Sequence, residues 1–334
     1  MDSQWKHKIF NVTPSNFEVL ALELFHFQYK NNAVYREYVD TLNVSPSSVL
    51  SLAQIPFLPI RLFKSHIIKS CAFAPGEIFE SSGTSGMTNS KHYIRDIDFY
   101  KESFVKCFRL FYGDPGGWCI IGLLPSYLER KNSSLVFMVN ELIRRSNNPD
   151  SGFYLDELDK LSDLLKKSEL KRQKTLLIGV TFALLDFAKG YPMSLDHTII
   201  METGGMKGRQ KELVREEVHD ILIRSFHADA IHAEYGMTEL LSQAYSNGGG
   251  LFQCPQWMKV LVRDDEDPLL VKPIGYPAED PYVTGAINII DLANVYSCSF
   301  IATDDAGRLY PDGRFEVLGR MDNSDLRGCS LMVV

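Results

Sequence analysis

Apolar segments that alternate with helical patterns constrain the fold of this chain more than any other feature. Three pairs of an apolar run followed by a helical pattern share this form: residues 118–124 with 134–145, 175–180 with 182–188, and 197–201 with 211–226. The third pair is joined by ETGGMKGR, a glycine-rich turn. Repetition of strand, turn and helix is typical of an α/β fold with a largely parallel sheet. Such sheets bind ligands at the carboxyl ends of their strands.

The stretch ESSGTSGMTNSK at residues 80–91 concentrates hydroxyl side chains and glycines. Its candidate phosphate-binding residues are Ser81, Ser82, Gly83, Thr84, Ser85 and Gly86. Backbone amides and hydroxyl groups in such a loop can surround a phosphate. The GxxxxGK[ST] pattern of common nucleotide-binding loops is absent, because Met87 and Thr88 follow Gly86. Taken alone, the stretch also fits a solvated serine–glycine turn.

A second polar cluster, IHAEYGMTEL at residues 231–240, supplies three groups that a nucleotide site needs. Tyr235 offers a flat ring for a base, Thr238 an oxygen for a phosphate, and Glu239 a carboxylate for Mg²⁺. His232 lies in the apolar part of this segment, where we expect a hydrogen-bonded core residue rather than a base. Upstream, the glycines at Gly204 and Gly205 let the backbone approach a ligand closely.

Length and charge narrow the class of protein. The chain has 334 residues, 45% of them hydrophobic, and a net charge of -7, which predicts a large core and disfavours a nucleic-acid partner. No apolar run is long enough to cross a bilayer and the N-terminus has no signal-peptide pattern, so we expect a cytoplasmic protein. The six cysteines show no CxxC pair and are predicted to be free thiols.

Three further helices and a β-rich region complete the prediction. Helices are expected from Pro14, over residues 96–111 with Asp96 as the cap, and over 155–167. From residue 251 the pattern changes to short strands, with the clearest at 260–262 and 286–292. The predicted organisation is therefore residues 1–250 as an α/β core that binds a nucleotide, 251–318 as a β-rich lobe of the same domain, and 319–334 as a C-terminal tail.

The order of these motifs resembles that of the adenylate-forming superfamily of acyl- and aryl-CoA ligases and luciferases. Five family motifs have counterparts: the Ser/Thr/Gly loop at residues 81–86, the glycine pair Gly204–Gly205, YGxTE at 235–239, TGDxGR at 303–308 and GRxDD at 319–323. The resemblance implies the large N-terminal domain of that family, with parallel-rich sheets flanked by helices and a smaller β-rich lobe. It implies ATP and Mg²⁺ as cofactors.

The segments LLPSYLERKNSSLVFM, ETGGMKGR and GRMDNSDLRGCS resemble most closely the acyl-protein synthetases of the LuxE type. In that branch the mobile C-terminal lobe is expected to be largely absent. The resemblance implies a fatty acid as substrate and a possible acyl-CoA-reductase-like partner of the LuxC type. The sequence departs from the superfamily pattern at three positions. Asp304 replaces the glycine next to the proposed ribose-binding residue, Asn323 replaces the second aspartate of the hinge motif, and Lys91 is displaced from the usual position of the loop lysine.

The resemblance also implies a role for each matching residue. Residues 81–86, Gly204 and Gly205 would contact the phosphates, and Thr238 would touch the α-phosphate. Tyr235 would stack on adenine, with Gly236 and Met237 beside it in the cofactor site. Glu239 would hold Mg²⁺, Asp305 would bind the ribose, and Arg320 would lie at the hinge. Lys91, Lys207 and Arg320 are candidates for the cation that offsets charge between carboxylate and phosphate.

Cys329 is the predicted acyl acceptor. It lies nine residues after Arg320, so an extended tail reaches up to roughly 30 Å from the hinge. Arg327 would favour the nucleophilic thiolate. The predicted activity is thus acid–thiol ligation: a fatty carboxylate forms acyl-AMP, and a protein cysteine then takes the acyl group. An acyl- or aryl-CoA ligase of the phenylacetate type and a non-catalytic, adenylate-binding scaffold are the alternatives.

Overall fold

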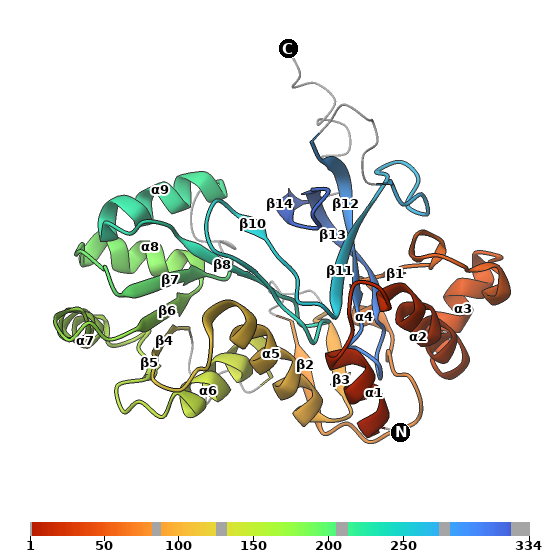
Figure 1. Cartoon of the computed structure of the whole chain (residues 1–334), viewed down its shortest axis with the longest axis horizontal. Coiled ribbons are helices and arrows are strands. Elements are labelled where there is room, and N and C mark those ends of the chain that lie inside the picture. The colour runs from red at the N-terminus through yellow and green to blue at the C-terminus, as the bar shows by residue number, and fades with distance from the viewer. Residues whose placement is uncertain (1, 82–87, 125–131, 205–212, 274–280, 322–334) are drawn as a thin grey trace, which may run out of the picture. The chain divides into compact units, whose positions relative to one another are not determined.

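The structure is a computed structural model, and it describes residues 2–81, 88–124, 132–204, 213–273 and 281–321 (Figure 1). Contacts divide the chain into two compact units. Unit 1 comprises Met1–Ser103, Thr238–Ser242 and Gln253–Val334, and unit 2 comprises Phe104–Met237 and Gln243–Phe252. Each unit thus combines segments that are distant in the sequence. The domain ranges 1–250, 251–318 and 319–334 stay predictions.

Unit 2 is built on a sheet whose neighbouring strands follow the order β5-β4-β6-β7-β8-β9. These strands are β4 (Cys119–Leu123), β5 (Gly152–Phe153), β6 (Thr175–Gly179), β7 (Thr198–Glu202), β8 (His232–Tyr235) and β9 (Ala244–Ser246), and β10 (Leu251–Phe252) follows them in the chain. The pairs from β5 to β8 are parallel, whereas β9 joins β8 antiparallel. All residues of β4 and β6 are buried, as expected for strands covered on both faces. The predicted parallel α/β arrangement is confirmed.

Helices cover both faces of this sheet (Figure 1). They are α6 (Ser134–Ser146), α7 (Leu158–Leu170), α8 (Thr181–Gly190), α9 (Arg215–Phe226) and the part of α5 (Ile97–Tyr112) after Ser103. Helices α7, α8 and α9 share one hydrophobic core with Ile121, Leu177 and Ile200 of the strands. On the other face, Val139 of α6 packs over Gly122 of β4.

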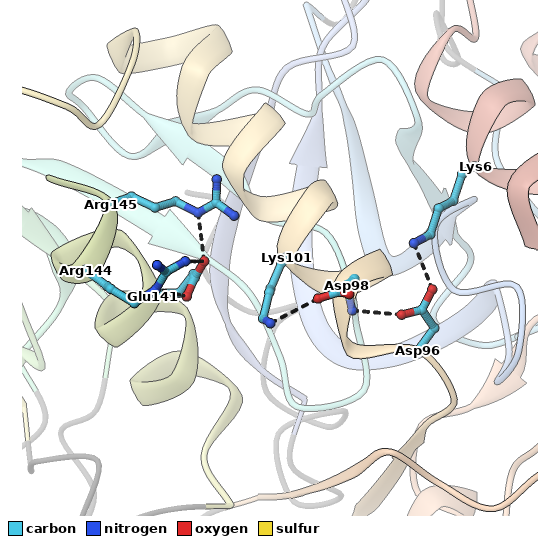
Figure 2. A network of polar contacts seen from close by, with 7 residues as sticks. All are labelled: Lys6, Asp96, Asp98, Lys101, Glu141, Arg144 and Arg145. Atoms are coloured by element: carbon cyan, nitrogen blue, oxygen red, sulfur yellow. Dashed lines mark hydrogen bonds and ion pairs between the residues drawn. The ribbon is translucent and has the colours of Figure 1, made fainter. Parts of the chain in front are cut away.

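Charged side chains fix the ends of two helices (Figure 2). In unit 1, Asp96 accepts a hydrogen bond from a backbone amide in the first turn of α5 at 2.9 Å and pairs with Lys6 at 2.8 Å. The predicted aspartate cap of α5 is confirmed. In unit 2, the buried Glu141 accepts hydrogen bonds from Arg144 and Arg145 in the last turn of α6, at 2.7 and 2.8 Å. Cations in the last turn also interact favourably with the helix dipole.

Unit 1 contains an antiparallel sheet in the order β14-β13-β12-β11, with β1 parallel to β13. The strands are β1 (Leu58–Pro59), β11 (Met258–Arg263), β12 (Val283–Asp291), β13 (Phe300–Leu309) and β14 (Phe315–Arg320), while β2 (Glu77–Glu80) and β3 (Lys91–Ile94) form a separate antiparallel hairpin. The strands predicted at residues 260–262 and 286–292 are therefore confirmed as parts of β11 and β12.

The N-terminal helices belong to unit 1: α1 (Asp2–Phe10), α2 (Phe17–Asn31), α3 (Ala33–Thr41) and α4 (Leu62–Ser65), with 3-10 turns η1 (Pro46–Ser48) and η2 (Leu52–Gln54). Gln28 of α2 is fully buried and binds the turn between β12 and β13. Its amide nitrogen donates to the carbonyls of Asn294 and Val295 at 3.0 and 2.9 Å, and its oxygen accepts from the Ser299 amide at 2.9 Å. This turn is therefore rigidly held against α2.

Some predicted helix boundaries are wrong by a few residues. Helix α2 begins at Phe17 rather than at Pro14, because the backbone amide of Thr13 donates to the Asn16 side chain at 2.8 Å and closes a turn before the helix. Helix α7 begins at Leu158 instead of residue 155. Asn and Asp side chains compete with the helix for backbone groups near its start, which periodicity alone does not reveal.

The cysteines of the described ranges, Cys71, Cys107, Cys119, Cys254 and Cys298, are thiols rather than disulfides, as predicted. Within those ranges, no helix combines the length and apolar character that a membrane crossing requires.

Candidate functional site

In unit 2, two of the predicted site residues lie at the carboxyl ends of neighbouring parallel strands. Strand β7 ends at Glu202, just before Gly204, and β8 ends at Tyr235, with Glu202 in register with Ala233. Gly204 has φ of 75°, a left-handed conformation that favours glycine. Tyr235 is mostly buried, and Gly205 lies outside the described residues. The two motifs thus share the sheet edge at which α/β folds bind ligands.

A buried carboxylate, Glu202, organises this edge. It accepts hydrogen bonds from the Thr181 hydroxyl at 2.8 Å and the Gly204 amide at 3.2 Å, and it pairs with Arg215 at 3.2 Å and with His219 at 3.6 Å. Burial alone would raise the pKa of Glu202, but the proximity of His219, the charge of Arg215 and the hydrogen bond from Thr181 outweigh burial and lower it to about 2. Glu202 is therefore an anion that holds the glycine turn in place.

Glu234, the residue before Tyr235, has the opposite character. Burial, and then the charge of Glu202, raise the pKa of Glu234 to about 8, so this carboxyl group is neutral at pH 7. A Cβ atom at Gly236 would lie 2.4 Å from Glu234 Oε1, so a larger residue at position 236 would require the Glu234 side chain to move. Nearby, the buried Oε1 of Gln243 accepts no hydrogen bond from the described residues. Unit 2 therefore presents uncharged polar oxygens beside Tyr235.

In unit 1, the hairpin β2–β3 holds both ends of the Ser/Gly loop. The Ser81 amide donates to the Ser90 carbonyl at 3.1 Å, and the Ser90 amide donates to the Ser81 hydroxyl at 2.9 Å. Lys91 pairs with Glu80 at 3.5 Å across the same hairpin. The remaining loop residues assigned to phosphate, Ser82, Gly83, Thr84, Ser85 and Gly86, lie outside the described residues.

Glu239 lies against the base of this loop. Glu239 is 6% exposed, and the Ser90 side chain lies near its carboxyl group and helps to lower its pKa. Burial raises the pKa of Glu239, while the Ser90 hydrogen bond and the positive charges of Arg320 and Lys64 oppose the rise. Lys64, an exposed residue of α4, was not predicted, because no motif surrounds it in the sequence.

The residues around Glu239 suit a Mg²⁺ ion that keeps most of its ligands as water and phosphate oxygens. Where Mg²⁺ binds together with substrate phosphates, the protein usually supplies only one or two carboxylates. Within the described ranges there is no cluster of three His, Cys, Asp or Glu side chains that would form an all-protein cage. Glu239 is thus a fitting single ligand.

Asp305 and Arg320 are directly paired in register on β13 and β14. The two side chains approach to 3.9 Å between Arg320 Nε and Asp305 Oδ1, and Arg320 is exposed whereas Asp305 is 8% exposed. Asp304, where the family pattern has glycine, binds Arg61 through both carboxylate oxygens at 2.9 and 3.1 Å. The departure at position 304 therefore has a structural partner and leaves Asp305 in place.

Among the predicted residues of unit 1, Asp305 and Arg320 are paired, and the charge of Arg320, together with that of Lys64, acts on Glu239. Within the YGMTE motif, Tyr235, Gly236 and Met237 belong to unit 2, whereas Thr238 and Glu239 belong to unit 1. His232 donates to or accepts from the Tyr112 hydroxyl at 3.2 Å, so it is a hydrogen-bonded residue as predicted. Cys329, Lys207 and Asn323 lie outside the described residues.

Sequence reasoning missed Glu202, Glu234 and Gln243 in unit 2, and Ser90 and Lys64 in unit 1. A single signal could have identified Glu202 and Glu234, since each is an acidic residue at the end of an otherwise apolar run. Buried acids at strand ends are candidates for functional sites.

Comparisons with known proteins agree with this fold. No family model matches the chain, and no curated protein matches it. The chain superposes on ATP-bound MatB from Rhodopseudomonas palustris with a TM-score of 0.52 and 16% identity, covering 73% of this chain and 47% of MatB. It superposes on 2-hydroxyisobutyryl-CoA ligase in complex with 2-HIB-AMP and CoA with a TM-score of 0.63 and 12% identity, covering 92% and 78%. A postadenylation-state structure of that ligase gives a TM-score of 0.65, covering 92% and 68%.

The chain therefore spans about half the length of MatB, at 47%, and a larger share of the 2-hydroxyisobutyryl-CoA ligase. Identities of 12% to 16% establish similarity of fold. The predicted fold, that of the large domain of the adenylate-forming enzymes, is confirmed.

Proposed function

We propose that this protein activates a carboxylic acid with ATP to give acyl-AMP and pyrophosphate. The substrate that we propose is a fatty acid. One observation supports the proposal: the buried Glu239 lies near Ser90, which is hydrogen-bonded to Ser81. Ser81 and Ser90 flank the segment that we assign to phosphate, and Glu239 is the carboxylate that we assign to Mg²⁺. Two solved structures of the same fold hold ATP or an acyl adenylate, according to their descriptions.

The chain's own residues would bind and orient the reactants. Loop amides and hydroxyls at residues 81–86 would hold the phosphates, Thr238 the α-phosphate, and Asp305 the ribose hydroxyls, while Tyr235 would stack on adenine. When bound through Glu239, Mg²⁺ would offset negative charge on the phosphates. Positioning accounts for most of the rate in reactions of this kind, because the carboxylate must approach phosphorus in line.

Cations near Glu239 would reduce repulsion between the carboxylate substrate and the phosphates. Arg320 and Lys64 both contribute positive potential at Glu239. Lys91 is paired with Glu80, which weakens its claim to this role. Arg320 is thus the favoured cation among those predicted, with Lys64 as an additional one.

In the second half-reaction, we assign Cys329 as acceptor on the basis of its resemblance to the acyl-protein synthetases. The Cys329 thiolate would attack the carbonyl carbon of acyl-AMP, a C–S bond would form, and the bond from carbon to the AMP oxygen would break. The products are a thioester and AMP. The same resemblance supports a LuxC-type reductase that receives the acyl group, and a cytoplasmic location remains the expectation from the sequence.

A CoA ligase of the phenylacetate type is the second candidate, because one superposed structure is a CoA ligase described with CoA bound. In that case CoA, rather than Cys329, would take the acyl group. A non-catalytic scaffold that binds adenylate is the third, and it predicts neither exchange nor labelling.

The decisive experiment measures the intact mass of the protein after incubation with Mg·ATP and a mixture of fatty acids without CoA. We expect one acyl adduct on the wild type and on Cys71→Ser, but none on Cys329→Ser, with ATP–pyrophosphate exchange retained in all three.

Glu239→Gln should reduce exchange by at least about 100-fold, since an electrostatic contact to the reacting phosphates contributes about 3 kcal/mol. Exposed Glu216→Gln is its matched control. Unchanged exchange in Glu239→Gln would remove the metal assignment, and acyl-CoA formed on addition of CoA would favour the CoA ligase.

A further inference from the structure

His92, the second residue of β3, is fully buried in unit 1 and lies between two hydrogen-bond acceptors. Its Nδ1 is 2.8 Å from the carbonyl oxygen of Thr238, and its Nε2 is 3.0 Å from Oδ1 of Asn294. The ring also meets Phe63 edge-on, with ring centroids 6.0 Å apart. His92 therefore contacts the backbone of the YGMTE motif directly.

The orientation of the Asn294 amide follows from its other contacts. Its Nδ2 donates to the carbonyl of Glu239 at 2.7 Å and to that of Cys298 at 2.9 Å, so its Oδ1 must face His92. The turn that carries Asn294 is itself held by Gln28. Together, His92 and Asn294 bind the two successive carbonyl oxygens of Thr238 and Glu239.

Both ring nitrogens of His92 thus face acceptors, but a neutral imidazole has only one N–H. Burial lowers the pKa of His92 to about 4, against smaller opposing effects of Thr238 and Asn294, so the ring is neutral at pH 7. A lone pair on Nδ1 would face the Thr238 oxygen at the shorter of the two distances. The tautomer protonated at Nδ1 avoids this closer repulsion.

We propose that His92 is a positioning residue, which donates from Nδ1 to the Thr238 carbonyl and, with Asn294, fixes the backbone from which Thr238 and Glu239 reach the nucleotide. The inference rests on the proposed function for its catalytic consequence. The backbone clamp itself is a property of unit 1. Without the clamp, the peptide at Thr238 rotates more freely, and Glu239 loses its fixed approach to Ser90.

Two amide variants separate the two nitrogens of the ring. The side-chain nitrogen of His92→Asn occupies the place of Nδ1 and keeps a donor toward Thr238, whereas that of His92→Gln occupies the place of Nε2 and does not. We expect hydrogen–deuterium exchange in the peptide over residues 237–243 to be about ten-fold faster in His92→Gln, the ratio expected for one lost hydrogen bond. His92→Asn should restore most of the protection. Exposed His66→Gln is the matched control and should behave as wild type.

For the proposed reaction, His92→Gln should raise KM for ATP and lower the exchange rate, with His92→Asn intermediate. Wild-type protection in His92→Gln, or equal loss in both variants, would overturn the inference. Absence of exchange activity in the wild type would contradict the proposed function alone, since deuterium exchange still decides the clamp. If His92→Gln does not fold, a long-range ¹H–¹⁵N spectrum of the wild type decides instead: a protonated Nδ1 supports the inference and a protonated Nε2 overturns it.

Discussion

The substitution Glu234→Gln should make the protein less sensitive to alkaline pH than the wild type. Burial in β8 and the nearby charge of Glu202 raise the pKa of Glu234 from 4.5 to about 8. Between these two values the folded protein holds a proton that the unfolded chain has released. Stability therefore decreases as pH rises through this window, and glutamine, which resembles the protonated acid in shape, has no proton to lose.

The structure sets the size of this effect. Each pH unit inside the window removes about 1.4 kcal/mol from the free energy of unfolding. Between pH 5.5 and pH 8, Glu234 alone should thus reduce the stability of the wild type by about 3 kcal/mol. Folded proteins typically have a free energy of unfolding of about 5–15 kcal/mol, so this loss is a substantial part of the total stability. The Glu234→Gln variant should lack this loss.

Urea unfolding followed by circular dichroism at pH 5.5, 6.5, 7.5 and 8 would measure the effect. The stability of Glu234→Gln relative to wild type should increase by about 3 kcal/mol across the series. Glu216→Gln, on the exposed side of α9, should follow the wild type. Parallel pH profiles for Glu234→Gln and wild type would show that Glu234 is charged in the folded protein, and would refute the reasoning.

Two other carboxylates give further tests. Asp291→Asn should reduce the free energy of unfolding by about 2–4 kcal/mol, because the Asp291 carboxylate accepts from three backbone amides at 2.8, 3.0 and 3.1 Å and from the Ser242 hydroxyl at 2.6 Å, and an amide nitrogen cannot accept. A loss below about 1 kcal/mol in urea unfolding would contradict this. Glu202→Gln should lower the pKa of Glu234, since the charge of Glu202 contributes to its rise; ¹³C titration of the Glu234 carboxyl group would measure it, and an unchanged pKa would contradict the assigned cause.

The alternation of apolar and helical segments was sufficient to predict the fold of unit 2. Fully buried parallel strands such as β4 and β6 are short apolar runs, and glycine turns mark their ends, so the local sequence carries the signal. Helix starts were less predictable, as at Phe17, because side-chain hydrogen bonds in the preceding turn decide them.

Motifs could be found from the sequence, but their supports could not. The contacts of His92 with Thr238 and Asn294 join residues 146 and 202 positions apart, so no local pattern reports them. The same holds for Lys64, whose charge acts on Glu239 from a short helix without a motif. Which side chain binds a given backbone carbonyl depends on tertiary packing. Such residues can therefore be identified only from the three-dimensional structure.

Glu202 and Glu234 show why burial alone does not decide the charge of an acid at this sheet edge. Both are buried on adjacent parallel strands of unit 2. Glu202 stays ionised because Arg215, His219 and Thr181 contact its carboxylate. For Glu234 burial is the main influence on the pKa, and the charge of Glu202 further favours its protonated form. The carboxyl group of Glu234, next to Tyr235 in the chain, is therefore neutral at pH 7. One charged and one neutral acid place less negative charge at this edge than two carboxylates would, so the unequal pair would repel an anionic ligand less strongly.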